Sequence, residues 1–145
     1  MSLRSIFDVL LELSGVSMLA LALLHLYFAR LLGWSADLRN LKPINAQVFN
    51  AHTIFLVGGI TLLGLSCICF AAAMTARTTL GAVAAGCFAL CWLSRLICQF
   101  VLFKAPFCEN TRLEFLLRLL GALIWCFYTG LFAALFAFQI GVIGN

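Results

Sequence analysis

The sequence predicts an all-α integral membrane protein, a bundle of four transmembrane helices joined by short loops. Two features of composition lead to this class: 65% of the 145 residues are hydrophobic and only 10% are charged. An average soluble domain carries about 25% charged residues, and a soluble chain of this length has too little interior to hide so much apolar surface. The third feature is that the apolar residues form four long runs. We therefore expect a single domain over residues 1–145 whose surplus apolar surface faces the lipid bilayer.

The four runs predict helices over about residues 6–32, 44–74, 79–103 and 113–140. Each run exceeds the roughly 20 residues that a helix needs to cross the hydrocarbon core, and none alternates in the manner of a barrel strand. The first run is too long for the core of a signal peptide, and no small-residue cleavage site follows it. The second run contains no Asp, Glu, Lys or Arg.

The breaks between the runs agree with this division. Both prolines, Pro43 and Pro106, fall between runs, where they cost no helical hydrogen bond. The break at 75–78 is so short that the second and third helices are expected to be antiparallel neighbours. The first loop, about residues 33–42, is long enough to let the first two helices stand apart.

The basic residues predict an orientation. Five of them belong to loops 1 and 3 or their edges: Arg30, Arg39, Lys42, Lys104 and Arg112. Two, Arg4 and Arg77, belong to the other side. The positive-inside rule therefore predicts a multi-pass protein of the cell membrane, inner or plasma, with loops 1 and 3 cytoplasmic and both termini outside. The cations are scattered and form no phosphate-binding stripe, so no nucleic-acid partner is expected.

The seven cysteines predict no disulfide framework. Six of them lie inside the apolar runs: Cys67, Cys69, Cys87, Cys91, Cys98 and Cys126. The seventh, Cys108, lies in the third loop. No pair has the C-x-x-C spacing of a redox site or the C-x-x-C-H spacing of haem attachment, and a buried free cysteine behaves as a small hydrophobic residue.

Small residues on the third and fourth helices predict close backbone packing. They include Gly81, Gly86 and Ala85 on the third helix and Gly130 on the fourth. In lipid such residues let helices approach without a hydrophobic driving force. They fit packing inside the bundle, a homo-oligomer or a larger membrane complex, and the sequence leaves these open.

Polar residues at membrane depth are the informative feature, because they are costly there and usually face the bundle interior. At 1.5 Å per residue, His25, His52, Arg95 and Arg118 lie roughly 7–13 Å inside the boundary that faces loops 1 and 3. Gln99 lies one helical turn nearer that boundary than Arg95. All four helices thus contribute polar groups at similar depth, which predicts a shared polar pocket near the cytoplasmic face.

Helical periodicity assigns these residues to faces. The predicted faces are Ser14, Met18 and His25 on the first helix, Asn45, His52, Gly59 and Ser66 on the second, Cys91, Arg95 and Gln99 on the third, and Glu114, Arg118, Gly121, Trp125 and Tyr128 on the fourth. Glu114 is an i, i+4 partner for Arg118. Arg95 has no acid on its own helix, and we expect it to point into the bundle toward the histidines. An excess of cation over anion there indicates an anionic ligand.

Three functions remain open on this sequence, and no nucleophile–base pair decides whether the protein is an enzyme. The first is an electron-transfer subunit that binds haem b through His25, His52, Arg95 and Gln99, with the two histidines as iron ligands. The second is a structural or accessory subunit of a larger membrane complex. The third is a binder, transporter or enzyme for an anionic lipid or other anionic amphiphile. Its anion site would be formed by Arg95, Arg118 and Asn45.

Overall fold

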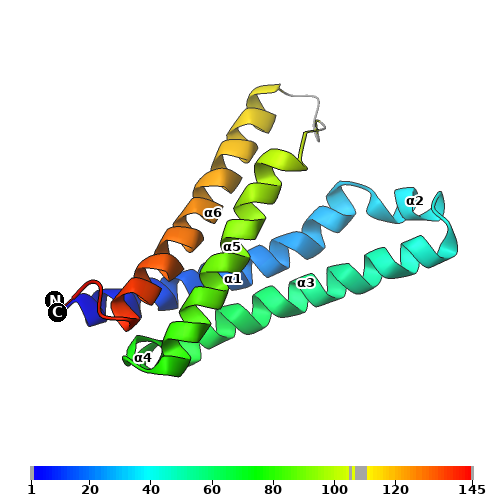
Figure 1. The fold of residues 1–145 in the computed structure, drawn as a ribbon. Coiled ribbons are helices and arrows are strands. Elements are labelled where there is room, and N and C mark those ends of the chain that lie inside the picture. The colour runs from blue at the N-terminus through cyan, green and yellow to red at the C-terminus, as the bar shows by residue number, and fades with distance from the viewer. Residues whose placement is uncertain (1, 105, 107–110, 145) are drawn as a thin grey trace. The chain divides into compact units, whose positions relative to one another are not determined.

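The structure is a computed structural model, and it describes residues 2–104, 106 and 111–144. Its helices are, in chain order, α1 (Leu3–Leu31), α2 (Trp34–Arg39), α3 (Pro43–Cys69), α4 (Ala71–Thr75), α5 (Thr79–Val101) and α6 (Thr111–Gln139) (Figure 1). The described residues contain no strand. Four helices, α1, α3, α5 and α6, are long and apolar enough to cross a membrane. The predicted all-α class with four membrane-length helices is therefore confirmed.

Large apolar side chains on these helices are open to the surroundings. Phe55 is 80% exposed, Leu80 79% and Ile54 72%. Leaving one such side chain in water forgoes about 1.5–3 kcal/mol relative to burying it. A protein that exposes many of them is stable only where lipid covers them, which agrees with a multi-pass membrane protein.

Most helix ends differ from the prediction by one to three residues, and two features differ by more. The predicted helix 44–74 ends at Cys69, where Phe70 leaves the helical region with φ −123° and ψ 20°, and the short α4 follows. The predicted first loop contains α2, which begins after Gly33 with φ 66°, a conformation that glycine adopts without a steric penalty. A hydropathy pattern predicts neither feature. The segments before and after Phe70 are both apolar, and α2 is only six residues long.

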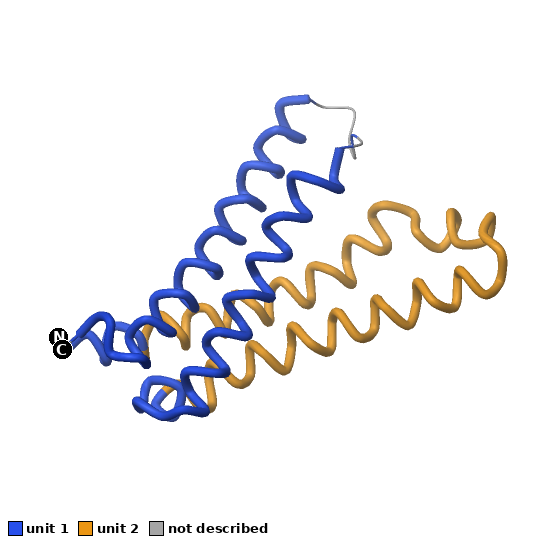
Figure 2. The backbone as a smooth tube through the Cα atoms, in the orientation of Figure 1, with its two compact units in different colours: residues 1–7, 72–145 blue, residues 8–71 orange. Residues whose placement is uncertain are grey.

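The chain divides into two compact units (Figure 2). Unit 1 comprises residues 1–7 and 72–145, and unit 2 comprises residues 8–71. The expected single domain and the expected pairing of the second and third membrane helices both concern the relation between the units, so they stay predictions.

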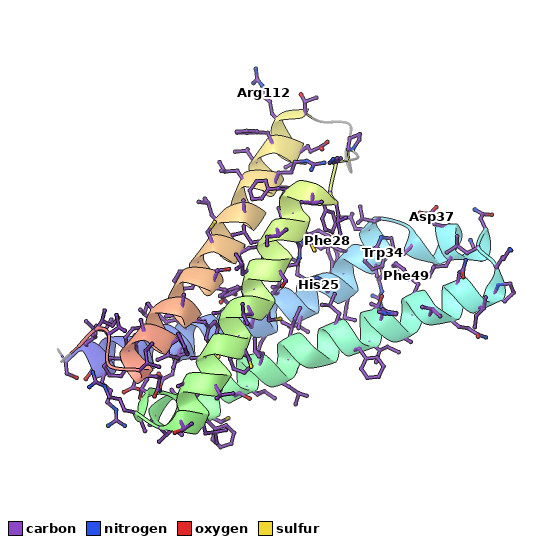
Figure 3. The ribbon with its side chains drawn as sticks, viewed as in Figure 1. His25, Phe28, Trp34, Asp37, Phe49 and Arg112 are labelled. Carbon is purple, nitrogen blue, oxygen red and sulfur yellow. The ribbon has the colours of Figure 1, made fainter. Side chains whose placement is uncertain are left out.

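Unit 2 is built on a close approach of α1 and α3 at two glycines. A Cβ atom at Gly15 would lie 2.6 Å from the carbonyl oxygen of Gly64, and a Cβ at Gly64 would lie 2.9 Å from the carbonyl oxygen of Gly15. The backbones therefore touch here, and the two helices do not stand apart along their whole length. Toward α2 they diverge (Figure 2), and Trp34 packs its ring edge-on against Phe49 with centroids 5.1 Å apart (Figure 3).

Unit 1 is built on the packing of α5 against α6. Phe88 of α5 meets Phe132 of α6 with ring centroids 5.3 Å apart. Gly86 lies against the Phe136 ring, and Ala85 is fully buried. These small residues of α5 serve the internal packing of the unit. A Cβ at Gly130 would meet nothing within 4 Å, so this glycine is not used in that way.

Gln139 closes unit 1 at the end where α4 turns into α5. Its Nε2 donates to the Met74 carbonyl, and its Oε1 accepts from the Thr78 backbone N–H at 3.1 Å. The Thr78 hydroxyl in turn accepts from the Gly81 N–H at 3.0 Å and caps α5. Capping at this position typically contributes about 1 kcal/mol. We call this arrangement the Gln139 clasp.

The two basic residues of unit 1 near this end bind backbone carbonyls. Arg77 donates through Nη2 to the carbonyls of Ile143 at 3.1 Å and Gly144 at 2.6 Å. Arg4 donates to the Ala72 carbonyl at 3.2 Å and to the Thr75 hydroxyl at 3.3 Å. Their charges are thus solvated by backbone dipoles.

Candidate functional site

Arg95 lies inside a membrane-length helix and is held by its own helix. It is six residues before the end of α5 at Val101, which is about 9 Å along the axis. Its Nη1 donates to Oε1 of Gln99 at 3.2 Å, one turn further on. Both side chains are half-buried. The i, i+4 spacing therefore brings the two side chains together on one face of α5, and the predicted direction of Arg95 toward the histidines stays a prediction.

Aromatic rings from two segments of unit 1 flank the same guanidinium. Its carbon lies 4.5 Å from the centroid of the Trp125 ring on α6 and 4.9 Å from that of Phe103, just beyond α5. Trp125 also stacks on Trp92 at 5.5 Å between centroids and 12° between planes. Cation–π contacts of this kind stabilise a partly desolvated cation by about 1–2 kcal/mol. They offset part of the cost of the charge without neutralising it.

Arg118, unlike Arg95, has an acidic partner among the described residues. Its Nη2 lies 2.7 Å from Oε1 of Glu114, and its Nε donates to the same oxygen at 2.8 Å. The predicted pairing of these residues is therefore confirmed. Arg118 also donates through Nη1 to the carbonyl of Phe103. Phe103 thus serves both arginines, one through its ring and the other through its backbone.

Among the described residues of this place, two arginines face one carboxylate. Glu114 is engaged by Arg118, and Arg95 has no ion pair within the described part of unit 1. The predicted polar face of α6 is also confirmed: Glu114, Arg118 and Gly121 are partly buried, Trp125 is 6% exposed and Tyr128 2%. We call Arg95, Gln99, Phe103, Trp125 and Gly121 the Arg95 site.

The two histidines belong to unit 2 and each bonds to its own helix. Nδ1 of His25 lies 2.9 Å from the Leu21 carbonyl oxygen, and Nδ1 of His52 lies 2.8 Å from that of Val48. A carbonyl only accepts, so each bond fixes the proton on Nδ1 and leaves Nε2 for another partner. His25, on α1 (Figure 3), is half-buried and His52 is exposed.

The predicted polar face of α3 is not the face that this helix buries. Asn45, His52 and Gly59 are exposed. The buried residues of α3 are Ile60, Gly64 and Cys67, about a quarter of a turn away at 100° per residue. Polar residues that recur every seven positions lie on one face of a helix. Which face of α3 packs against α1 depends on the close contact at Gly64.

Two open hollows in unit 2 are lined mostly by apolar side chains. One, of about 490 Å³, is lined by Val9, Glu12, Leu13, Val16 and Ile68. The other, of about 270 Å³, is lined by Leu19, Ala22, Leu23, Leu26, Val57 and Thr61. Neither hollow is lined by His25 or His52.

The structure thus brings together only part of the predicted site. Arg95, Gln99 and Trp125 meet in unit 1, with the Glu114–Arg118 pair bonded to the same Phe103. The histidines and Asn45 lie in unit 2, so the pocket that all of them share stays a prediction. Sequence reasoning missed Phe103, because it sought polar side chains, and this residue acts through its ring and its backbone carbonyl.

Cysteine and metal chemistry add little to this picture. Six cysteines are free thiols, and Cys108 lies outside the described residues. Among the described residues, no group of three or more His, Cys, Asp or Glu side chains is placed to hold a metal ion.

No protein-family model, curated protein or solved structure matches this chain.

Proposed function

We propose that this protein binds an anionic amphiphile, a lipid or lipid-like acid, at the Arg95 site. One observation carries the proposal: a half-buried guanidinium inside a membrane-length helix is held in place by Gln99 and Trp125, yet has no carboxylate among the described residues. Binding is the step that a carrier and an enzyme for such a molecule have in common.

The contrast with Arg118 supports a ligand at Arg95. An arginine at membrane depth costs about 2.5–3.5 kcal/mol on insertion scales, and a neighbouring acid offsets this cost for Arg118. Aromatic rings and a neutral amide offset it only in part for Arg95. A planar guanidinium that keeps free donor edges suits the oxygens of a phosphate or carboxylate.

The test is lipid retention by the purified protein. Wild type in nanodiscs of phosphatidylcholine and phosphatidylglycerol is expected to retain phosphatidylglycerol in native mass spectrometry. Arg95→Gln should lower that retention about tenfold, the loss of hydrogen bonds to a charged group. Arg112→Gln is the control, because it removes the same charge from an exposed position at the start of α6.

Equal retention by wild type and Arg95→Gln would contradict the proposal. The role of a structural or accessory subunit would then be preferred, with the Arg95 contacts serving helix packing alone.

A second candidate, a haem b-binding electron-transfer subunit, is favoured by the histidine geometry. An iron ligand needs a free ring nitrogen while the other nitrogen is held by a hydrogen bond. Nδ1 of both His25 and His52 is held by a carbonyl of its own helix, so the chemistry of these donors fits haem iron. Protein from haem-replete cells is then expected to show a Soret band that His25→Leu and His52→Leu each remove. A spectrum without that band rules this candidate out.

The orientation follows from the basic residues. We propose a cell-membrane protein with loops 1 and 3 in the cytoplasm and both termini outside, on the count of five cations against two. This places the Arg95 site in the half of the bilayer nearer the cytoplasm. An alkaline phosphatase reporter fused after residue 145 is expected to be active, and one fused after Lys42 is expected to be inactive. The reverse pattern would show the opposite orientation in the membrane.

A further inference from the structure

Trp125 carries a polar group that the contacts described above do not use. Its side chain is 6% exposed, and its Nε1 is buried without a hydrogen-bond partner. Leaving a buried donor unpaired costs about 1–3 kcal/mol, so nearly all such groups in folded proteins have a partner. The same ring lies under the Arg95 guanidinium, which places an unused N–H donor beside a cation that has no ion pair among the described residues.

Gly121 provides room at this donor. It lies one turn before Trp125 on α6, and a Cβ built there would lie 3.6 Å from Nε1 of Trp125 and 3.8 Å from Nε2 of Gln99. Two nitrogen donors thus flank the missing side chain. Oε1 of Gln99 is bonded to Arg95, so its amide presents N–H groups on the other side.

We propose that Arg95, Gln99 and Trp125 form a three-donor site for one oxyanion, the phosphate or carboxylate of the amphiphile, and that Gly121 keeps the space for its oxygen. This inference rests on the proposed function and deepens it, since it names the acidic group and the residue that admits it. The oxygen accepts from the indole N–H, while Arg95 supplies the charge. The Gln99 amide, the end of a flexible side chain, turns to let the oxygen reach Nε1.

The three donors also determine which headgroup the site favours. All three groups donate, and Oε1 of Gln99 is already engaged by Arg95. A zwitterionic headgroup presents the same ionised phosphate together with an ammonium group, and the Arg95 cation repels that ammonium. The site is therefore expected to favour acids over zwitterions.

Gly121→Ala tests the space without disturbing the packing. The added methyl meets its neighbours at ordinary contact distances, and alanine favours a helix over glycine, so the thermal midpoint should not fall. Retention of phosphatidylglycerol should drop about tenfold, because the oxygen loses its place between two donors. Gly130→Ala is the matched control on the same helix, since a Cβ there meets nothing within 4 Å.

Trp125→Phe tests the donor itself, and the indole proton reports it directly. In protein labelled with ¹⁵N at tryptophan, the indole N–H signal of Trp125 should move downfield when phosphatidylcholine nanodiscs receive phosphatidylglycerol. The signal of Trp34, which lies in unit 2, should stay in place. Gly121→Ala and Arg95→Gln should abolish the movement, and Gly130→Ala should not.

The outcomes separate this inference from the proposal on which it rests. Loss of retention in Arg95→Gln with an unmoved Trp125 signal overturns the three-donor site but leaves the proposed function. No retention by wild type overturns both. Movement with oleate but not phosphatidylglycerol supports the site with a carboxylate ligand. Movement with inorganic phosphate alone supports an oxyanion site and overturns its assignment to an amphiphile. A Trp125→Phe variant that loses stability but keeps full retention shows a purely internal network and overturns the inference.

Discussion

The guanidinium carbon of Arg95 on α5 lies over the ring of Trp125 on α6, 4.5 Å from its centroid. This contact holds the cation in unit 1, and it depends on the shape of the guanidinium as well as on its charge. A guanidinium is flat and weakly hydrated, whereas an ammonium is compact and strongly hydrated. The consequences of replacing Arg95 therefore depend on what replaces it.

Arg95→Lys is expected to lower retention of phosphatidylglycerol about threefold to tenfold although the charge remains, because lysine loses the stacking and the fork of donors. Arg95→Leu should lower it further. The leucine variant should unfold at a temperature no lower than wild type, since it removes a charge that costs about 2.5–3.5 kcal/mol at this depth. Native mass spectrometry and thermal unfolding in detergent measure the two effects. Full rescue by lysine would mean that charge alone matters.

The Glu114–Arg118 pair is expected to stabilise unit 1 without taking part in binding. A double-mutant cycle with Glu114→Gln and Arg118→Gln should give a coupling energy of about 1 kcal/mol. Unfolding in mixed dodecyl sulfate micelles measures it. The double variant keeps the net charge and should retain anionic lipid as wild type does. A loss of retention equal to that of Arg95→Gln would place Arg118 in the binding site.

Gln139→Leu is expected to destabilise unit 1 by about 2 kcal/mol or more, because it leaves the Met74 carbonyl and the Thr78 N–H without their partner in a buried place. The exposed Gln47 on α3 is the control, and Gln47→Leu should change stability little. The same micelle unfolding assay compares them. Equal effects of the two substitutions would show that the Gln139 clasp contributes nothing.

Gly15→Ala is expected to destabilise unit 2 by about 1–3 kcal/mol, the usual range for overpacking. The added Cβ would lie 2.6 Å from a backbone oxygen of α3, which cannot swing aside. Gly59→Ala should instead be neutral or stabilising by up to about 1 kcal/mol, since nothing lies near its Cβ. The difference between these two glycine substitutions is the measured quantity, and its absence would contradict the backbone contact.

The fold class could be predicted because membrane length and apolarity are properties of continuous segments. The ends of helices could not, since the break at Phe70 and the helix α2 depend on backbone conformation and neighbouring contacts. Within the site, periodicity found the Glu114–Arg118 pair and the face of Trp125. It could not find that Phe103 connects both arginines, or that Gln139 bonds to residues 74 and 78, because these contacts join segments far apart in the chain.

The carbonyl partners of Arg77 also set an order of events during synthesis. Arg77 leaves the ribosome 66 residues before Ile143, which is roughly 3–13 s at 5–20 residues per second. Throughout that interval the insertion machinery meets this arginine with a charge that none of these carbonyls yet solvates. Arg77 therefore becomes a ligand of these carbonyls only after the chain has been made through Gly144. The turn between α4 and α5 is completed after translation of α6, so a stalled chain would present it open to quality-control proteases.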